Sequence, residues 1–241
     1  KPTVIRRSVA FAQAVFDGEM TVEGVMAKRV SSAQEAIRVI ENGAIPVLVD
    51  PLCESLNELR PVCVVDAILA KENFGTQREM APAVIALGPG FCAGVDCHAV
   101  IETNRGHWLG QVIYDGKAQE NTGVPGNILG HTSRRVIRAP GAGVMRAKVA
   151  LGEIVNEGDI IATVGEAEII APLSGMVRGL LSDGLAVESG FKIGDIDPRG
   201  ASADFTSVSD KARAIGGGVL EALMTLMNKR VKEKSELLSV A

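Results

Sequence analysis

The hydrophobic pattern divides the chain into two parts of different character. Up to about residue 130, short apolar runs at residues 46–50, 61–69 and 83–87 alternate with segments of helical periodicity. Strands that are continuous apolar runs are typical of parallel sheets whose two faces are both covered. Residues 1–130 are therefore predicted to form an α/β domain.

Start and stop signals place helices between these runs. Apolar spacing predicts a helix over residues 3–16, and loose alternation predicts a strand over residues 21–30. Ser32 followed three residues later by Glu35 forms a capping box, so a second helix is expected to begin there and to end near Gly43.

The second part of the chain contains an internal repeat. The motif Ala-Pro-x-x-Gly at residues 139–143 returns at residues 171–175, and Val-x-x-Gly-x-x-Ile at residues 155–161 returns at residues 187–193. Both motifs return after 32 residues. The repeat predicts two half-units of short strands that form a pseudo-symmetric β sandwich over residues 131–208.

This repeat resembles the biotinyl/lipoyl carrier fold, a barrel-sandwich hybrid. In such carriers the modified lysine lies on the hairpin between the half-repeats. Here residues 165–170 read Gly-Glu-Ala-Glu-Ile-Ile and contain no lysine. We therefore expect the fold without the carrier function and without a prosthetic group.

A helix with an apolar stripe is predicted at the end of the chain, over residues 209–241. Gly216, Gly217 and Gly218 are expected to precede its regular part, where each would weaken a helix by about 1 kcal/mol relative to alanine. Two interpretations stay open: close packing against another backbone, or an anionic ligand at the helix start.

Composition narrows the functional classes. With 46% hydrophobic and 22% charged residues in 241, the chain can bury a core. A net charge of −4 argues against a nucleic-acid partner, and no apolar run approaches the roughly 20 residues of a membrane span. Four cysteines do not make a disulfide framework in a chain of this length, so a cytoplasmic location is expected. The spacing of Cys92 and Cys97 does not fit a zinc site, and whether the protein binds another metal stays unknown. Because the chain starts at Lys1, we expect it to begin partway into a longer product.

Gly88-Pro89-Gly90 follows the apolar run at residues 83–87. Rossmann-like proteins bind ligands at glycine-rich turns after the carboxyl ends of parallel strands, where backbone N–H groups can hold an anion. Gly88 and Gly90 are therefore candidate cofactor-binding residues, with an ordinary strand-ending loop as the alternative.

His98 and Glu102 are four residues apart and share a face in either a strand or a helix. Arg105 and His107 follow closely, so proton transfer or metal binding is predicted for this cluster. The alternative is a structural His98 and a Glu102 that pairs with Arg105.

Three further residues are candidates for binding an anionic cofactor. Asn121 lies in the turn cluster of residues 121–126. Arg199 either pairs with an acid or clamps a phosphate. Lys211, just before the three glycines, either neutralises the same anion or faces solvent.

Long segments of the chain also resemble one family. They are residues 2–11, 87–91, 100–107, 121–126, 195–200 and 209–218. The family is that of the YqeB-like accessory and maturation proteins of the selenium-dependent molybdenum hydroxylase system. The resemblance implies a partner of the xanthine dehydrogenase kind, and as ligand a molybdopterin-type cofactor or a selenium species.

The resemblance leaves two forms of the function open. As an enzyme, the protein would act on the cofactor or on an activated selenium species, with His98, Glu102, Arg105 and His107 in acid/base or ligand roles. As a non-catalytic chaperone, it would bind the apo-hydroxylase or a nucleotide-containing cofactor. Relatives usually begin with a nucleotide-binding-like segment that this chain lacks, and whether the protein forms a homo-oligomer stays open.

Overall fold

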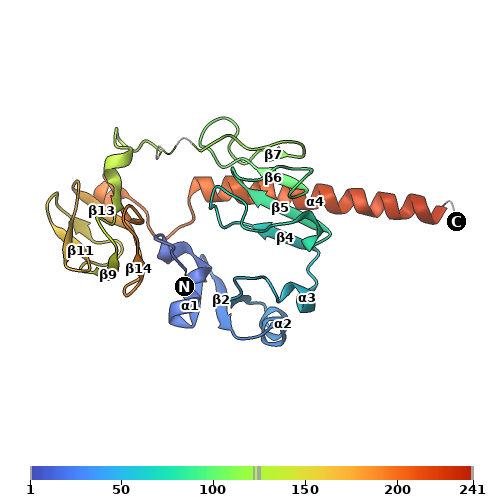
Figure 1. Ribbon diagram of the computed structural model, residues 1–241, viewed down its shortest axis with the longest axis horizontal. Helices are drawn as coiled ribbons and strands as arrows, with labels where there is room; N and C mark the ends of the chain where they lie inside the picture. The colour runs from blue at the N-terminus through green and yellow to red at the C-terminus, as the bar shows by residue number, and fades with distance from the viewer. Residues whose placement is uncertain (1, 122, 124–125, 240–241) are drawn as a thin grey trace. The chain divides into compact units, whose positions relative to one another are not determined.

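The computed structural model describes residues 2–121, 123 and 126–239, which fold as mixed α/β with several sheets and a long C-terminal helix (Figure 1). The chain forms two compact units. The sandwich unit contains Lys1–Ser55 and Val124–Ser207, and the helix-sheet unit contains Leu56–Gly123 and Val208–Ala241. These boundaries differ from the predicted division at residue 130, because residues before 56 pack with the second half of the chain.

The sandwich unit begins with a small sheet of order β1-β2-β3. Its strands are β1 (Glu19–Val22), β2 (Val25–Val30) and β3 (Ile45–Leu48). The predicted strand at residues 21–30 is thus an antiparallel hairpin, whereas β2 and β3 are parallel and joined by α2 (Ala33–Glu41). The predicted capping signal is confirmed, since Ser32 Oγ accepts a hydrogen bond from the Glu35 N–H.

The helix predicted over residues 3–16 is wrong. The segment instead forms the 3-10 turns η1 (Arg7–Val9) and η2 (Phe11–Gln13) and a single helical turn, α1 (Ala14–Asp17). The Leu180 N–H donates to the Ile5 carbonyl, and Arg7 Nε donates to the Leu180 carbonyl at 2.7 Å. Pairing with a distant strand therefore overrides the local helical periodicity.

Two open four-stranded sheets form the rest of the sandwich unit, with orders β10-β13-β15-β8 and β12-β11-β9-β14. The strands are β8 (Val136–Arg138), β9 (Gly143–Ala147), β10 (Ile154–Val155), β11 (Ile160–Val164), β12 (Ala167–Ile170), β13 (Gly175–Leu180), β14 (Ala186–Val187) and β15 (Lys192–Asp197). Short 3-10 turns flank them at η4 (Ser133–Arg135) and η5 (Gly200–Ser202).

The sequence repeat corresponds to the order of these strands. β9, β10 and β11 begin 32 residues before β13, β14 and β15, and β8 has its counterpart in β12. Exchanging each strand for its counterpart converts one sheet order into the other, reversed. Buried aliphatic residues of both sheets, such as Met145, Ile161 and Ile193, share one core. The 32-residue offset therefore reports two equivalent sheets, although they do not close into a barrel.

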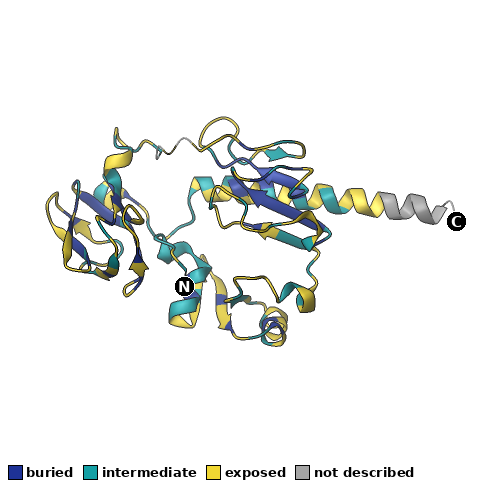
Figure 2. Ribbon diagram, in the orientation of Figure 1, coloured by how far each residue is buried: buried dark blue, intermediate teal, exposed yellow. Residues whose placement is uncertain are grey.

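The helix-sheet unit has one sheet of order β4-β5-β6-β7. Its strands are β4 (Cys63–Asp66), β5 (Ala83–Leu87), β6 (Ala99–Ile101) and β7 (Val112–Ile113). The first three are parallel and β7 is antiparallel. β5 is the predicted apolar run and is buried along its whole length (Figure 2). The unit also contains the short helix α3 (Leu56–Leu59), which precedes β4, and the turn η3 (Arg78–Met80), which precedes β5.

The helix α4 (Asp210–Ser239) covers one face of this sheet. Its Ile215 and Ala222 pack with Ile85 and Ile101, whereas loop residues, among them Phe91, pack on the other face. One helix and a set of loops thus replace the predicted cover of helices on both faces. Within residues 2–121, 123 and 126–239, no helix combines the length and hydropathy that a membrane span requires.

The three glycines lie inside α4 and do not precede it, because the helix already begins at Asp210. A Cβ at Gly218 would overlap the Gly110 carbonyl oxygen, whereas Gly216 and Gly217 face open space. Close backbone packing therefore explains Gly218.

Candidate functional site

The carboxyl ends of the parallel strands bring several predicted residues to one edge of the helix-sheet unit. β4, β5 and β6 end at Asp66, Leu87 and Ile101, so Gly88 and Glu102 follow directly at that edge. The Gly110 N–H, which donates to the Glu102 carbonyl, holds the loop on which the first turns of α4 pack. This carboxyl edge is where sheets of this kind hold ligands.

The Gly88–Gly90 loop is packed tightly against its own chain. Both glycines have positive φ, +81° and +106°. A Cβ at Gly88 would lie 2.5 Å from Thr103 Oγ1, and one at Gly90 would lie 2.5 Å from the Glu72 backbone nitrogen. The Gly88 N–H donates to the Ile101 carbonyl. Packing therefore accounts for both glycines, and the Gly88 N–H is not free to bind an anion.

Glu102 is buried at 2% exposure, and each oxygen of its carboxylate accepts a backbone hydrogen bond. One oxygen accepts from the Asn104 N–H at 2.7 Å and the other from the Gln119 N–H at 2.8 Å. The alternative pairing with Arg105 is wrong, because Arg105 makes a bidentate ion pair with Asp210 at 2.8 and 2.9 Å. Glu102 thus ties together two loops of the carboxyl edge.

Lys211 lies in the first turn of α4, half-buried among other charges. Burial, reinforced by the positive charges of Arg105 and Lys71, lowers the pKa of Lys211, while Glu102 opposes this shift. Lys71 lies in a loop with backbone strain, since it and Leu69 have φ of +71° and +58°. The carboxyl edge therefore gathers three cationic side chains around a buried carboxylate.

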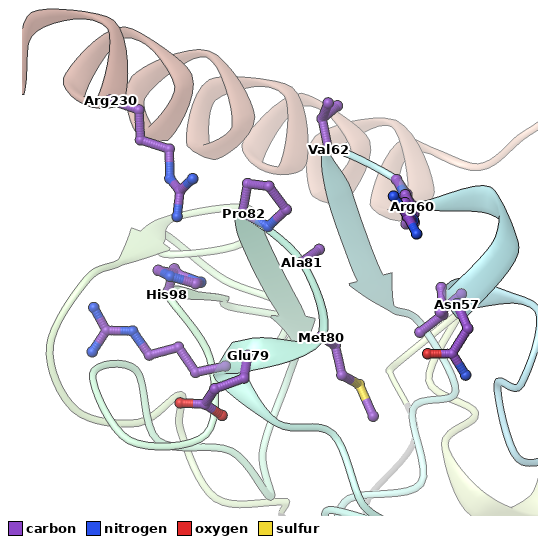
Figure 3. Close-up of a pocket in the computed structure, with 12 residues that line it drawn as sticks. Asn57, Arg60, Val62, Glu79, Met80, Ala81, Pro82, His98 and Arg230 are labelled. Carbon is purple, nitrogen blue, oxygen red and sulfur yellow. The ribbon is translucent and has the colours of Figure 1, made fainter. Parts of the chain in front are cut away.

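His98 lies at the opposite edge of the same sheet. It precedes β6 and lines a cavity there (Figure 3), and its Nδ1 accepts a hydrogen bond from the Val84 N–H at 3.0 Å. The predicted convergence of His98 and Glu102 is therefore wrong. Residues i and i+4 of a strand share a face, but they are separated along it by about 13 Å.

The environment of His98 predicts a specific pH dependence. Burial, together with the charges of Arg78 and Arg230, lowers the pKa of His98. The unfolded chain then binds more protons than the folded unit as pH falls below about 6.5, so folding stability must decrease there. We expect urea midpoints, followed by Trp108 emission, to fall between pH 7 and pH 5 by more in the wild type than in His98→Gln. Parallel midpoints for the two proteins would contradict the assignment.

The remaining predicted residues do not form a cluster at either edge of the sheet. His107 is exposed, and its ring makes a T-shaped contact with the ring of Trp108, with 4.5 Å between the ring centres. Asn121 is exposed, and residues 122, 124 and 125 of its turn cluster lie outside the described residues. Arg199 belongs to the sandwich unit, where it binds the fully buried Asp197 at 2.9 and 2.6 Å. The acid-pairing interpretation of Arg199 therefore fits.

The thiols and acids do not form a metal centre in the described part of the chain. No group of three or more His, Cys, Asp or Glu is arranged there to hold a metal ion. Burial, aided by Asp96, raises the pKa of Cys97 to about 11, so this thiol is unreactive near neutral pH.

Several charged residues at the two edges were missed by the sequence analysis. Asp66 is buried at the end of β4 and accepts hydrogen bonds from the Thr76 hydroxyl at 2.6 Å and from the Ile68 N–H. Its position within an apolar run could have revealed it. Lys71 lies on a loop, Arg78 in the turn η3 and Arg230 on α4, and no local motif distinguishes them.

No protein-family model matches the chain. The chain is 74% identical over all 241 residues to an Escherichia coli (strain K12) protein described as "Uncharacterized protein YqeB", and it spans 44% of that protein's length. This identity supports the YqeB-like resemblance predicted from the sequence motifs.

Solved structures match only a part of the chain. An aspartoacylase family protein from Mesorhizobium loti is 13% identical with a TM-score of 0.26, and the match covers 35% of this chain and 27% of that protein. The ectoine utilization protein EutE (DoeB) from Ruegeria pomeroyi is 21% identical with a TM-score of 0.25, over 35% of this chain and 27% of its own. We transfer no residue role from these matches.

Proposed function

We propose that this chain acts in the maturation of a selenium-dependent molybdenum hydroxylase of the xanthine dehydrogenase kind. In this proposal it handles the molybdenum cofactor or an activated selenium species in the cytoplasm. The support comes from the motif resemblance and from the identity to the YqeB protein. The same resemblance would make the parallel sheet a Rossmann-like fold, and the repeat would make the sandwich a barrel-sandwich hybrid without its lysine.

One structural observation carries the proposal: cationic side chains gather at the carboxyl edge of the parallel sheet. Lys71 and Arg105 lie close enough to Lys211 for their charges to lower its pKa, and Arg105 follows the carboxyl end of β6, where α/β sheets hold ligands. Arg105 is neutralised by Asp210, but Lys211 has no ion pair among the described residues. A phosphoryl group there would offset the burial of its ammonium. Molybdopterin and selenophosphate both carry such a group.

The separation of His98 from Glu102 favours the chaperone form of this function. General acid–base catalysis needs two groups within reach of the same reacting atoms. Here the Glu102 carboxylate is occupied by two backbone N–H groups, and His98 lies at the other edge of the sheet. The chain would then bind the cofactor or the apo-hydroxylase without chemical turnover.

The test is the metal and selenium content of the hydroxylase. Cells that lack this protein should accumulate a folded but inactive hydroxylase that is short of selenium or of complete molybdenum cofactor. Lys211→Gln should reproduce most of the defect, because it removes the half-buried cation. Lys117→Gln, an exposed charge loss in the same unit, should not.

Elemental analysis of the purified hydroxylase gives the answer for each strain. Full selenium and molybdenum occupancy in the deletion strain would refute the proposed function. Equal occupancy in the Lys211→Gln and wild-type strains would refute the placement of the site at the carboxyl edge.

A further inference from the structure

A cavity of about 850 Å³ opens at the amino edge of the parallel sheet, opposite the carboxyl edge (Figure 3). Residues that precede three strands line it, namely Val62, Pro82 and His98. Arg230 of α4 reaches over it from the helix. The cavity therefore lies within one compact unit and is built on a rigid sheet.

A second lobe of about 460 Å³ adjoins this cavity and extends toward Tyr114 and Leu226. The two lobes share Arg78, Pro82 and His98, and also Arg230. The shared residues therefore mark a junction between a polar lobe and a lobe with an aromatic and an aliphatic side chain.

The charges that line the two lobes are unbalanced. Arg60, Arg78, Arg230 and Lys229 line the two lobes, against the single acid Glu79. Within the described residues, none of the three arginines forms an ion pair. Arg78 donates a hydrogen bond of 3.2 Å to the Gly94 carbonyl. The guanidinium groups of Arg78 and Arg230, which line both lobes, are suited to an anion that accepts several hydrogen bonds.

His98 adds a neutral donor to these cations. Because the Val84 N–H donates to Nδ1, the neutral ring carries its proton on Nε2. The ring lies in the cavity near Arg230 (Figure 3). Burial first, and then the charges of Arg78 and Arg230, lower the pKa of His98, while Glu79 opposes this shift. Near neutral pH the ring can donate a hydrogen bond without adding another positive charge.

We propose that this cavity binds an organic phosphate monoester. The phosphoryl group lies at the junction, bound by Arg78, Arg230 and the Nε2–H of His98. The organic part lies in the lobe of Tyr114 and Leu226. A phosphate offers enough acceptor oxygens for two guanidinium forks and one imidazole donor, whereas a carboxylate offers only two oxygens. The site is separate from the carboxyl edge and does not rest on the proposed maturation role.

Calorimetric titration with phenyl phosphate at fixed ionic strength tests the proposal. We expect saturable binding at one site. Arg78→Gln and Arg230→Gln should each weaken it at least about tenfold, which corresponds to about 1.4 kcal/mol. Lys232→Gln removes a charge from the same helix but not from the lining of either lobe, so it should leave the affinity unchanged.

Four outcomes would overturn the proposal. They are the absence of saturable binding, equal binding of benzoate, equal weakening by Lys232→Gln, and full affinity in both arginine variants. The side chains of Arg78, Arg230 and Lys232 are all exposed, so melting curves should confirm that the three variants stay folded. Lys211→Gln should not change phenyl phosphate binding, which separates this test from that of the carboxyl edge.

Discussion

Replacing Gly218 by alanine is expected to destabilise the helix-sheet unit by about 3 kcal/mol, the upper end of what overpacking costs. The added methyl group would overlap the Gly110 carbonyl oxygen and lie 3.0 Å from Ile101 Cγ2. Neither neighbour can move freely, because one is backbone and the other belongs to the buried strand β6. The helix would have to shift away from the sheet and loosen its contacts with the strands.

Gly217→Ala is the matched control for this change. Gly217 is exposed in the same turn of α4, and a Cβ there would meet nothing within 4 Å. Alanine should therefore stabilise the helix by up to about 1 kcal/mol. Urea unfolding followed by the emission of Trp108, the single tryptophan of the chain, reports on this unit. Midpoints that shift in the same direction for both variants would contradict the packing account.

Some local and repeated sequence signals predicted individual elements of the fold correctly. The apolar run at residues 83–87 coincides with β5, and the capping box places the start of α2 correctly. The 32-residue repeat predicted two half-units, and the strands of one half-unit have counterparts in the other that take equivalent places in the two sheets. In each case the chemistry that forms the element lies within a few neighbouring residues or recurs at a fixed spacing.

Features that depend on distant contacts could not be predicted. Ile5 pairs with Leu180, so residues 3–16 do not form the helix that their spacing favours. Each compact unit is formed from two separate segments of the chain, and no change in composition marks where the chain passes from one unit to the other. The periodicity placed His98 and Glu102 on one face but carried no information about their separation along the strand.

The candidate site was predictable only where a local sequence signal marks it. A glycine turn after a buried strand locates the carboxyl edge from sequence alone, and Lys211 reaches it because α4 begins there. The amino-edge cavity has no such signal. Arg78 and Arg230 are far apart in the sequence, and they meet at His98 only because the turn η3 precedes β5 and α4 crosses the same sheet.

Replacing Glu102 by alanine should destabilise the helix-sheet unit by about 2–4 kcal/mol. The change removes the acceptor of two backbone N–H groups, those of Asn104 and Gln119, and each buried donor left without a partner costs about 1–3 kcal/mol. Glu102→Gln should lie between the two proteins, because its single carbonyl oxygen can satisfy one donor but its amide group opposes the other.

His107→Ala is the contrasting variant, because that side chain is exposed and contacts Trp108 edge-on. Its unfolding midpoint should shift by no more than about 0.5 kcal/mol. Far-UV circular dichroism in urea measures both variants without relying on Trp108, whose emission the His107 change affects directly. If Glu102→Ala unfolds at the wild-type midpoint, the Glu102 carboxylate of the wild type does not hold the loops together. That carboxylate would then be available for binding or proton transfer. If the midpoint falls as expected, a maturation defect in Glu102→Ala reports lost folding, whereas one in His107→Ala reports a lost function of the surface around Trp108.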